Sequence, residues 1–132
     1  MAPRTSRILL IDDEPLLGQT VRLAVEDQCE VVFASSGVDA LSALERDSSF
    51  DLILCDLSMP AISGIAVYEA VAERYPHLLS SFVLMTGGAF TYTAREFLQQ
   101  YSGLTLQKPF RLEELFRLLN RLNRRRPALG TG

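Results

Sequence analysis

Residues 51–60 read Asp-Leu-Ile-Leu-Cys-Asp-Leu-Ser-Met-Pro, and this stretch decides the fold. Its apolar run, Leu52 to Cys55, ends abruptly at Asp56, and Met59-Pro60 turns the backbone three residues later. Apolar side chains on both faces predict a strand that is covered on both sides, as in the middle of a parallel sheet. Ligands of open parallel sheets bind beyond the carboxyl ends of the strands, where Asp56 falls. This edge of the sheet is therefore the first candidate for a functional site.

The rest of the chain fits a single α/β domain. Strands are expected at residues 7–11, 30–34, 51–55, 81–85 and 104–106, and helices at 15–27, 38–47, 64–74, 94–101 and 112–122. Strands that alternate with helices predict right-handed crossovers and a parallel sheet between two helical layers. The length of 132 residues is enough for one domain with a sizeable core.

Composition limits the functional classes. The net charge of −3 is mild, and no apolar stretch is long enough to cross a bilayer, so we expect no membrane insertion. Arg4 and Arg7 precede only a short apolar run, which does not fit a secretory signal. Cys29 and Cys55 lack the spacing of a metal site. A reducing, cytoplasmic setting is expected for these thiols.

Polar residues follow four of the predicted strands. Asp12 and Asp13 come after the first strand, Asp56 after the third, Thr86 after the fourth and Lys108 after the fifth. Because the carboxyl ends of parallel strands share one edge, these side chains should converge if the first and third strands are neighbours. Lys108 is also the only lysine among 13 basic residues.

This combination of side chains suits a metal ion and a phosphoryl group. Crowded carboxylates repel one another, and Mg²⁺ relieves the repulsion while also binding phosphate oxygens. Asp56 is the natural nucleophile, because a carboxylate attacks phosphorus to give an acyl phosphate. Lys108 supplies a charge for the phosphoryl oxygens, and Thr86 supplies a hydroxyl that can follow them. Gly87 and Gly88 keep the neighbouring loop small enough for a phosphodonor to approach.

Taken in order, these motifs resemble the response-regulator receiver domain of two-component signalling. The resemblance covers residues 7–123 and rests on Asp12-Asp13, Asp56-Leu-Ser-Met59-Pro60, Thr86 and Lys108-Pro109-Phe110. It implies a flavodoxin-like, three-layer α/β sandwich with a parallel five-stranded sheet in the order 2-1-3-4-5. We expect the receiver domain at residues 1–124 and a basic, disordered tail at residues 125–132.

The resemblance assigns a metal site. It implies that Asp56 is the phosphoacceptor and also binds Mg²⁺ or Mn²⁺. Asp13 would bind the ion directly, and Asp12 would act largely through water. The backbone carbonyl of Ser58 would complete the protein ligands.

The resemblance also assigns the switch. Lys108 would pair with the phosphoryl group, and its peptide bond to Pro109 is expected to be cis. Thr86 would be the switch hydroxyl, in one loop with Gly87. Many relatives carry Tyr or Phe three residues before the lysine, an aromatic that swings inward on phosphorylation. This chain departs from that pattern, because Thr105 occupies the position.

The implied partner is a histidine on a sensor histidine kinase or a histidine phosphotransfer domain. A homodimer through the fourth helix, fifth strand and fifth helix is a further expectation. The stretch Met85–Thr91, with no effector domain beyond Arg126, resembles receivers at the carboxyl end of hybrid sensor kinases, and a single-domain regulator fits almost as well. The arginines near the carboxyl end suit a solvated helix terminus, so we expect no direct binding of nucleic acid.

Other classes stay open beside this interpretation. One is a protein-interaction domain that keeps the fold but is not switched by phosphate, and Thr105 is the feature that favours it. Another is a small enzyme or flavin carrier on the same fold, although acids occupy the place of a phosphate loop. As a receiver, the chain should catalyse no turnover beyond its own phosphorylation from a phosphodonor and its own dephosphorylation. Each motif alone fits a turn or a helix cap, but their coincidence at alternate strand ends favours a site.

Overall fold

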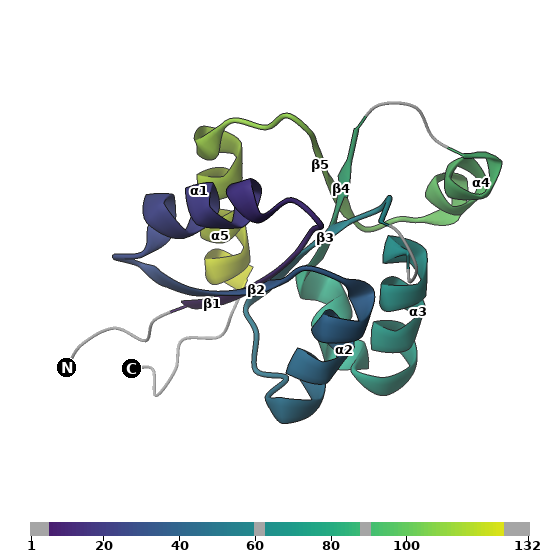
Figure 1. Ribbon diagram of the computed structural model, residues 1–132, viewed down its shortest axis with the longest axis horizontal. Helices are drawn as coiled ribbons and strands as arrows, with labels where there is room; N and C mark the ends of the chain where they lie inside the picture. Colours follow the sequence, from purple (N-terminus) through teal and green to yellow (C-terminus); the bar gives the residue numbers. More distant parts are fainter. Residues whose placement is uncertain (1–5, 60–62, 88–90, 126–132) are drawn as a thin grey trace.

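The computed structural model describes residues 6–59, 63–87 and 91–125. A parallel five-stranded sheet in the order β2-β1-β3-β4-β5 forms its centre (Figure 1). The strands are β1 (Ser6–Ile11), β2 (Cys29–Ala34), β3 (Leu52–Asp56), β4 (Phe82–Thr86) and β5 (Leu104–Gln107). This topology confirms the predicted flavodoxin-like fold, and it makes β1 and β3 neighbours, as convergence of the polar strand ends requires.

Helices cover both faces of the sheet. They are α1 (Pro15–Val25), α2 (Gly37–Arg46), α3 (Gly64–Arg74), α4 (Tyr92–Gln100) and α5 (Leu112–Arg125), with a 3₁₀ helix, η1 (Pro76–Ser81). Figure 1 shows α1 and α5 together on one face, α2 and α3 on the other, and α4 at the periphery beyond α3. In the part of the chain that the structure describes, no helix has the length and apolar character needed to span a membrane.

The central strand has the double burial that its sequence predicts. Ile53 and Cys55 pack into the apolar cluster beneath α2 and α3, whereas Leu52 and Leu54 pack into the cluster beneath α1 and α5. All four side chains are inaccessible to solvent. Successive strand residues point to opposite faces, so a strand buried on both sides must be apolar throughout. Asp56 is the first charged residue along this strand and stands at its carboxyl end.

Short polar residues begin the helices that lead away from the sheet edge. The Ser63 hydroxyl accepts a hydrogen bond from the Ala66 amide (3.3 Å), and the Thr91 hydroxyl accepts one from the Ala94 amide (3.1 Å). These caps satisfy amides that have no partner within the helix. Pro15 stands in the first turn of α1, where a missing N–H costs nothing. The starts of α1, α3 and α4 are thereby set by local sequence.

Some local predictions need correction. The apolar pattern that predicts the second helix includes Val38, Leu41 and Leu44, but Val38 is 56% exposed, because it lies about one residue off the buried stripe of that helix. The predicted inner face of α3 consists of Ile65, Tyr68, Val71 and Ala72, and Val67 is buried as well. The segment after α3 forms η1 rather than a plain loop.

Parts of the predicted tail and of two loops lie outside the described residues. Helix α5 continues through Arg125, one residue into the predicted tail, and the remaining tail residues 126–132 lie outside the described ranges. Pro60 and Gly88, which figure in the sequence motifs, also lie outside them.

Leu115 and Leu122 are core residues and Leu118 packs partly against the same cluster, so these leucines belong to the core.

Candidate phosphoryl and metal site

Four strand ends meet at one edge of the sheet. Asp12 directly follows β1, Asp56 ends β3, Thr86 ends β4, and Lys108 directly follows β5. Backbone hydrogen bonds fix the residues that follow the strands. The Asp12 amide donates to the Ala34 carbonyl (3.1 Å), and the Lys108 amide donates to the Thr86 carbonyl (2.6 Å). The sheet ladder thus sets the positions from which these side chains reach one another.

Three carboxylates form a compact group at this edge. Oxygen atoms of Asp12, Asp13 and Asp56 all lie within 4.8 Å of one another. Asp12 is fully buried, Asp56 is nearly so, and Asp13 is exposed. Carboxylate oxygens are the ligands that Mg²⁺ prefers, and an exposed carboxylate leaves room for the waters it retains. The donor set fits a hard divalent cation.

Backbone amides hold the two buried carboxylates in place. Asp12 Oδ1 accepts a hydrogen bond from the Glu14 amide (3.0 Å). Asp56 Oδ1 accepts one from the Ser58 amide (3.2 Å), which leaves Oδ2 of Asp56 facing Lys108. Each carboxylate therefore has one oxygen fixed by its own loop and a second directed into the site.

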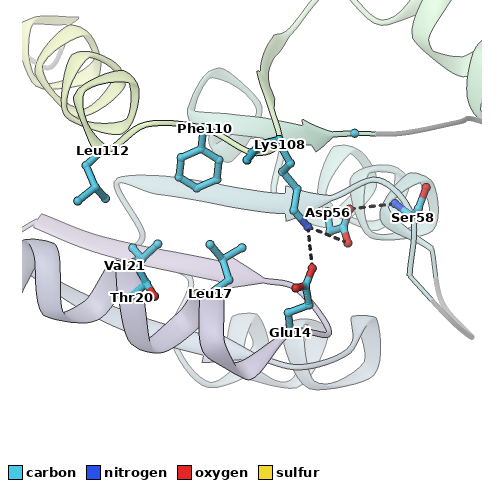
Figure 2. A pocket seen from close by; sticks show the side chains of 11 residues that line it. Glu14, Leu17, Thr20, Val21, Asp56, Ser58, Lys108, Phe110 and Leu112 are labelled. Atoms are coloured by element: carbon cyan, nitrogen blue, oxygen red, sulfur yellow. Dashed lines mark hydrogen bonds and ion pairs between the residues drawn. The ribbon is translucent and has the colours of Figure 1, made fainter.

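Lys108 is the positive centre of the site. Its Nζ donates to Asp12 Oδ2 at 2.7 Å and lies 3.6 Å from both Asp56 Oδ2 and Glu14 Oε1. Figure 2 shows the side chain extending from the β5–α5 loop towards Glu14 and Asp56. Burial lowers the pKa of Lys108, but the hydrogen bond to Asp12 and the charges of Asp56, Asp12 and Glu14 outweigh burial and raise it. The ammonium thus stays charged.

The environment of Asp56 disfavours the charged form of its side chain, whereas that of Lys108 favours it. Burial raises the pKa of the Asp56 carboxyl group, and the neighbouring carboxylates of Asp12 and Asp13 raise it further. The charge of Lys108 and the hydrogen bond from Ser58 lower this pKa, but the net direction is upward. A perturbed carboxylate with a lysine partner at a strand end is a candidate nucleophile.

The β4 exit lies close to Lys108. A Cβ atom on Gly87 would come within 3.2 Å of both Cβ and the carbonyl oxygen of Lys108, so a glycine suits this approach. Thr86 is partly buried one residue earlier. The peptide bond between Lys108 and Pro109 is cis.

A groove opens beside the charged site. Its volume is about 550 Å³, and it lies between α1 and the β5–α5 loop (Figure 2). Glu14, Asp56, Ser58, Gly87 and Lys108 line its polar end. Its apolar wall is formed by Leu17, Val21, Pro109, Phe110 and Leu112.

Sequence reasoning missed part of this arrangement. Glu14 was not among the predicted site residues, although its place directly after two aspartates was a usable signal. Leu17 and Phe110 carry no sequence signal for the groove, because their juxtaposition depends on how α1 and the β5–α5 loop pack. Thr105, expected in the switch, is exposed on the edge strand β5 and takes no part in this group.

Comparison with known proteins identifies the family. A family model described as the response regulator receiver domain matches residues 8–120. The chain belongs to the response regulator receiver family. Receiver domains in general bind Mg²⁺ in an acidic pocket and receive phosphoryl groups from histidine kinases or phosphotransfer domains. This chain has a compact acidic group, Asp12, Asp13 and Asp56.

Individual relatives of the receiver occur in different kinds of protein. "Sensor protein GacS" of Pseudomonas syringae pv. syringae is 32% identical over 120 residues, which cover 87% of this chain and 13% of GacS. "Response regulator protein PmrA" of Pseudomonas aeruginosa is also 32% identical, over 90% of this chain and 53% of PmrA. The receiver therefore spans about half or less of these curated relatives.

Solved structures share the fold of this receiver. A response regulator receiver domain protein from Clostridium thermocellum has a TM-score of 0.78 and 26% identity, over 91% of this chain and 95% of that chain. The adenylate cyclase structure from Rhodopirellula baltica has a TM-score of 0.77 and 26% identity, over 90% of this chain and 87% of that one.

Proposed function

We propose that this receiver domain is a phosphoacceptor switch in which Asp56 takes a phosphoryl group from a partner phosphohistidine in a Mg²⁺-dependent step. One observation carries the proposal: the nearly buried Asp56 carboxylate lies 3.6 Å from Lys108 and within the acidic group of Asp12 and Asp13. A nucleophile, a charge for the phosphoryl oxygens and ligands for a divalent cation are thus together at one sheet edge.

The transfer follows from the charges of these residues. Asp56 Oδ2 attacks phosphorus, an O–P bond forms, and the N–P bond to the donor imidazole breaks with its electron pair left on nitrogen. Lys108 leaves Asp12 and pairs with the phosphoryl oxygens. Asp12, Asp13, Asp56 and the Ser58 carbonyl would hold Mg²⁺, which supplies positive charge against these oxygens. Attack of water on the same phosphorus breaks the new O–P bond, releases inorganic phosphate and returns the free carboxylate.

The groove beside the site offers a route for the donor. Its polar end includes Asp56 and Lys108, and its wall presents Leu17, Val21 and Phe110. A partner that covers this apolar wall would exclude water and bring its phosphohistidine in line with Asp56. The partner of this proposal is a sensor histidine kinase or a histidine phosphotransfer domain.

Phosphorylation would change the charge at the end of β3. A phosphoryl group adds about −1.5 to −2 charges at neutral pH, close to Thr86 at the end of the neighbouring strand β4. We expect the Thr86 hydroxyl and the Gly87 loop to move inward and so to shift the face formed by α4, β5 and α5. A homodimer through this face is part of the proposal, and gel filtration with and without beryllofluoride and Mg²⁺ tests it.

Labelling with acetyl phosphate tests the phosphoacceptor. With Mg²⁺, intact mass should show one phosphoryl group on the wild-type protein and on Asp27→Asn, which changes an exposed aspartate remote from the sheet edge. Asp56→Asn should abolish labelling, and chelation of Mg²⁺ should suppress it in all variants. Unchanged labelling of Asp56→Asn would place the acceptor elsewhere.

A phosphate-independent interaction domain is the alternative, and amide spectra separate it from the switch. The proposal predicts that beryllofluoride with Mg²⁺ shifts amides from Asp56 towards α4, whereas the alternative predicts no such spread.

The proposal applies to the receiver domain whether it belongs to a sensor protein or to a response regulator, because relatives of both kinds match this chain. We place it in the cytoplasm, where its free thiols stay reduced. Both Cys29 and Cys55 are buried, and burial raises the pKa of each thiol.

A further inference from the structure

Tyr101 closes the carboxyl end of α4 and takes no part in the proposed chemistry. Its amide donates to the Phe97 carbonyl (3.0 Å), which ends the helix. Its hydroxyl lies 2.8 Å from the Leu104 carbonyl oxygen and 3.3 Å from the Phe82 carbonyl oxygen. Leu104 and Phe82 are the first residues of β5 and β4. One side chain therefore links the end of α4 to the beginnings of two strands.

The ring of Tyr101 adds contacts to a third element. It stacks on Phe97 of α4, with ring centres 5.7 Å apart and an interplanar angle of 24°. It meets Tyr68 of α3 edge to face, at 5.4 Å and 83°. Tyr68 in turn contacts Phe82 at 5.2 Å and Phe97 at 5.4 Å, also edge to face. Such pairs stabilise beyond the area they bury, so the end of α4 is held firmly.

Gly103 makes room for this arrangement. A Cβ atom at residue 103 would lie 2.4 Å from the Tyr101 hydroxyl oxygen, which is closer than any van der Waals contact. Burial also raises the pKa of Tyr101, so its hydroxyl keeps the proton that it donates. The sequence Tyr101-Ser-Gly103-Leu104 is thus built for a buried, hydrogen-bonded tyrosine.

Among the described residues, the amino end of α4 has no hydrogen bond or aromatic contact to another element that compares with those of Tyr101. Thr91 caps the helix through its own Ala94 amide, which ties it to no other element. Tyr92 is 75% exposed, so the core contact of this end rests on the small side chain of Ala94, the one residue of α4 that is buried. On β5, the exposed Thr105 offers no ring against which α4 can pack. The aromatic attachments of α4 are therefore concentrated at Phe97 and Tyr101.

We propose that Tyr101 is the fixed pivot of α4. Its contacts lock the carboxyl end of the helix to β4, β5 and α3, so that phosphorylation of Asp56 moves mainly the amino end, which follows Thr86 and Gly87 in the chain. This inference rests on the proposed function and specifies how its signal reaches the surface. A partner would then read the first turn of α4, where Tyr92 is exposed.

Hydrogen exchange of the unphosphorylated protein tests the anchor. Tyr101→Phe keeps the ring and removes the hydroxyl, and amides at residues 97–104 should exchange about fivefold faster, as for the loss of one net hydrogen bond. Tyr92→Phe removes a hydroxyl from the exposed end of the same helix and should leave these rates unchanged. Gly103→Ala should reproduce the effect of Tyr101→Phe, because it displaces the hydroxyl without altering the tyrosine. Unchanged exchange in both Tyr101→Phe and Gly103→Ala would overturn the proposal.

Amide shifts on activation test the pivot itself. With beryllofluoride and Mg²⁺, wild-type shifts should fall from Tyr92 towards Gln100, and in Tyr101→Phe they should extend to the carboxyl end of α4. Equal or larger shifts at the carboxyl end of wild-type α4 would overturn the pivot while leaving the phosphoacceptor proposal intact. If no amide shifts on addition of beryllofluoride and Mg²⁺, the phosphoacceptor proposal fails, and the proposed movement of α4 fails with it. The hydrogen-exchange rates of the unphosphorylated protein still test the anchor at Tyr101.

Discussion

Asp56 combines two properties that oppose each other. Burial and the nearby carboxylates raise its pKa, yet attack on phosphorus requires the ionised form. A carboxyl group whose pKa is raised by folding holds its proton more tightly in the native protein than in the unfolded chain. Its contribution to stability therefore falls as pH rises from the ordinary carboxyl pKa through the raised native pKa. At neutral pH, the site retains a nucleophile at the expense of stability.

Neutralising Asp56 should therefore stabilise the metal-free protein. We expect Asp56→Asn to raise the free energy of unfolding at pH 7 by about 1 kcal/mol, an ordinary size for one substitution. The difference should shrink towards pH 4, where Asp56 itself becomes protonated. Urea unfolding in EDTA between these pH values measures it, with the exposed Asp27→Asn as the control. A variant less stable than wild type at pH 7 would mean that the ion pair with Lys108 outweighs burial.

Glu14 is the partner of Lys108 that stands outside the acidic metal group. Its Oε1 lies 3.6 Å from Lys108 Nζ, and its side chain is 66% exposed. Glu14→Gln removes a competitor for the ammonium and one negative charge near an anionic phosphodonor. We expect labelling by acetyl phosphate to become about twofold faster at low salt and the gain to shrink at high salt. Glu113→Gln makes the same charge change on an exposed position of α5, and an equal gain there would contradict a local role.

At the scale of elements, the first turn of α3 packs directly against the backbone of the phosphoacceptor segment. The Gly64 amide donates to the Leu57 carbonyl (3.2 Å), and a Cβ atom on Gly64 would lie 2.2 Å from the Asp56 carbonyl oxygen and 2.8 Å from Leu57 Cα. These neighbours are backbone atoms, which cannot rotate away. The first turn of α3 can therefore approach the end of β3 only with glycine at this position.

Two substitutions at this helix start should differ in cost. Gly64→Ala should destabilise by about 3 kcal/mol or more, because α3 must move off the β3 loop. Ser63→Ala should cost about 1 kcal/mol, because it removes only the cap on Ala66. Urea unfolding of both variants gives the comparison. Alanine favours helix more than glycine does, so a Gly64→Ala protein as stable as wild type would contradict the close approach.

The sequence predicted those elements whose signals are local. Helix α3 has the predicted bounds, Gly64–Arg74, because a capping serine precedes it and Pro76 follows it. Strand β3 was predictable because burial on both faces makes a strand wholly apolar. Strand ends also predicted that Asp12, Asp56 and Lys108 would meet. Val38 was misplaced because an apolar residue one step off a helical stripe carries the same signal as one on it.

Features formed by packing between distant segments had no such signal. Lys108 pairs most closely with Asp12, across 96 positions of the chain, although sequence reasoning paired it with the phosphoryl group alone. The groove depends on where Leu17 and Phe110 face each other, and the anchor of α4 on where Tyr101 meets the beginnings of two strands. Periodicity and capping describe one element at a time, so neither could be predicted.

At the scale of the whole molecule, folding concentrates negative charge at one edge of the sheet. The carboxylates of Asp12, Asp13, Asp56 and Glu14 surround one ammonium. Only folding brings Asp56 and Lys108 to Asp12, Asp13 and Glu14, which are consecutive in the sequence. A cation that binds the assembled carboxylates therefore stabilises the fold by mass action. Mg²⁺ at about ten times its Kd should add about 1.4 kcal/mol. For a domain of this size, that energy should raise the thermal midpoint by about 5 °C.

The same edge distinguishes a specific site from general screening of charge. Asp13→Asn removes the exposed carboxylate of the acidic group and should abolish most of the Mg²⁺-dependent rise in thermal midpoint. In EDTA, the variant should be at least as stable as the wild-type protein, because repulsion between the carboxylates is relieved. Asp27→Asn has the same net charge and should keep the full rise. Thermal unfolding over a Mg²⁺ titration measures both. Equal rises in thermal midpoint for the two variants would show that Mg²⁺ acts only on the overall charge. The assembled carboxylates would then not form a specific metal site.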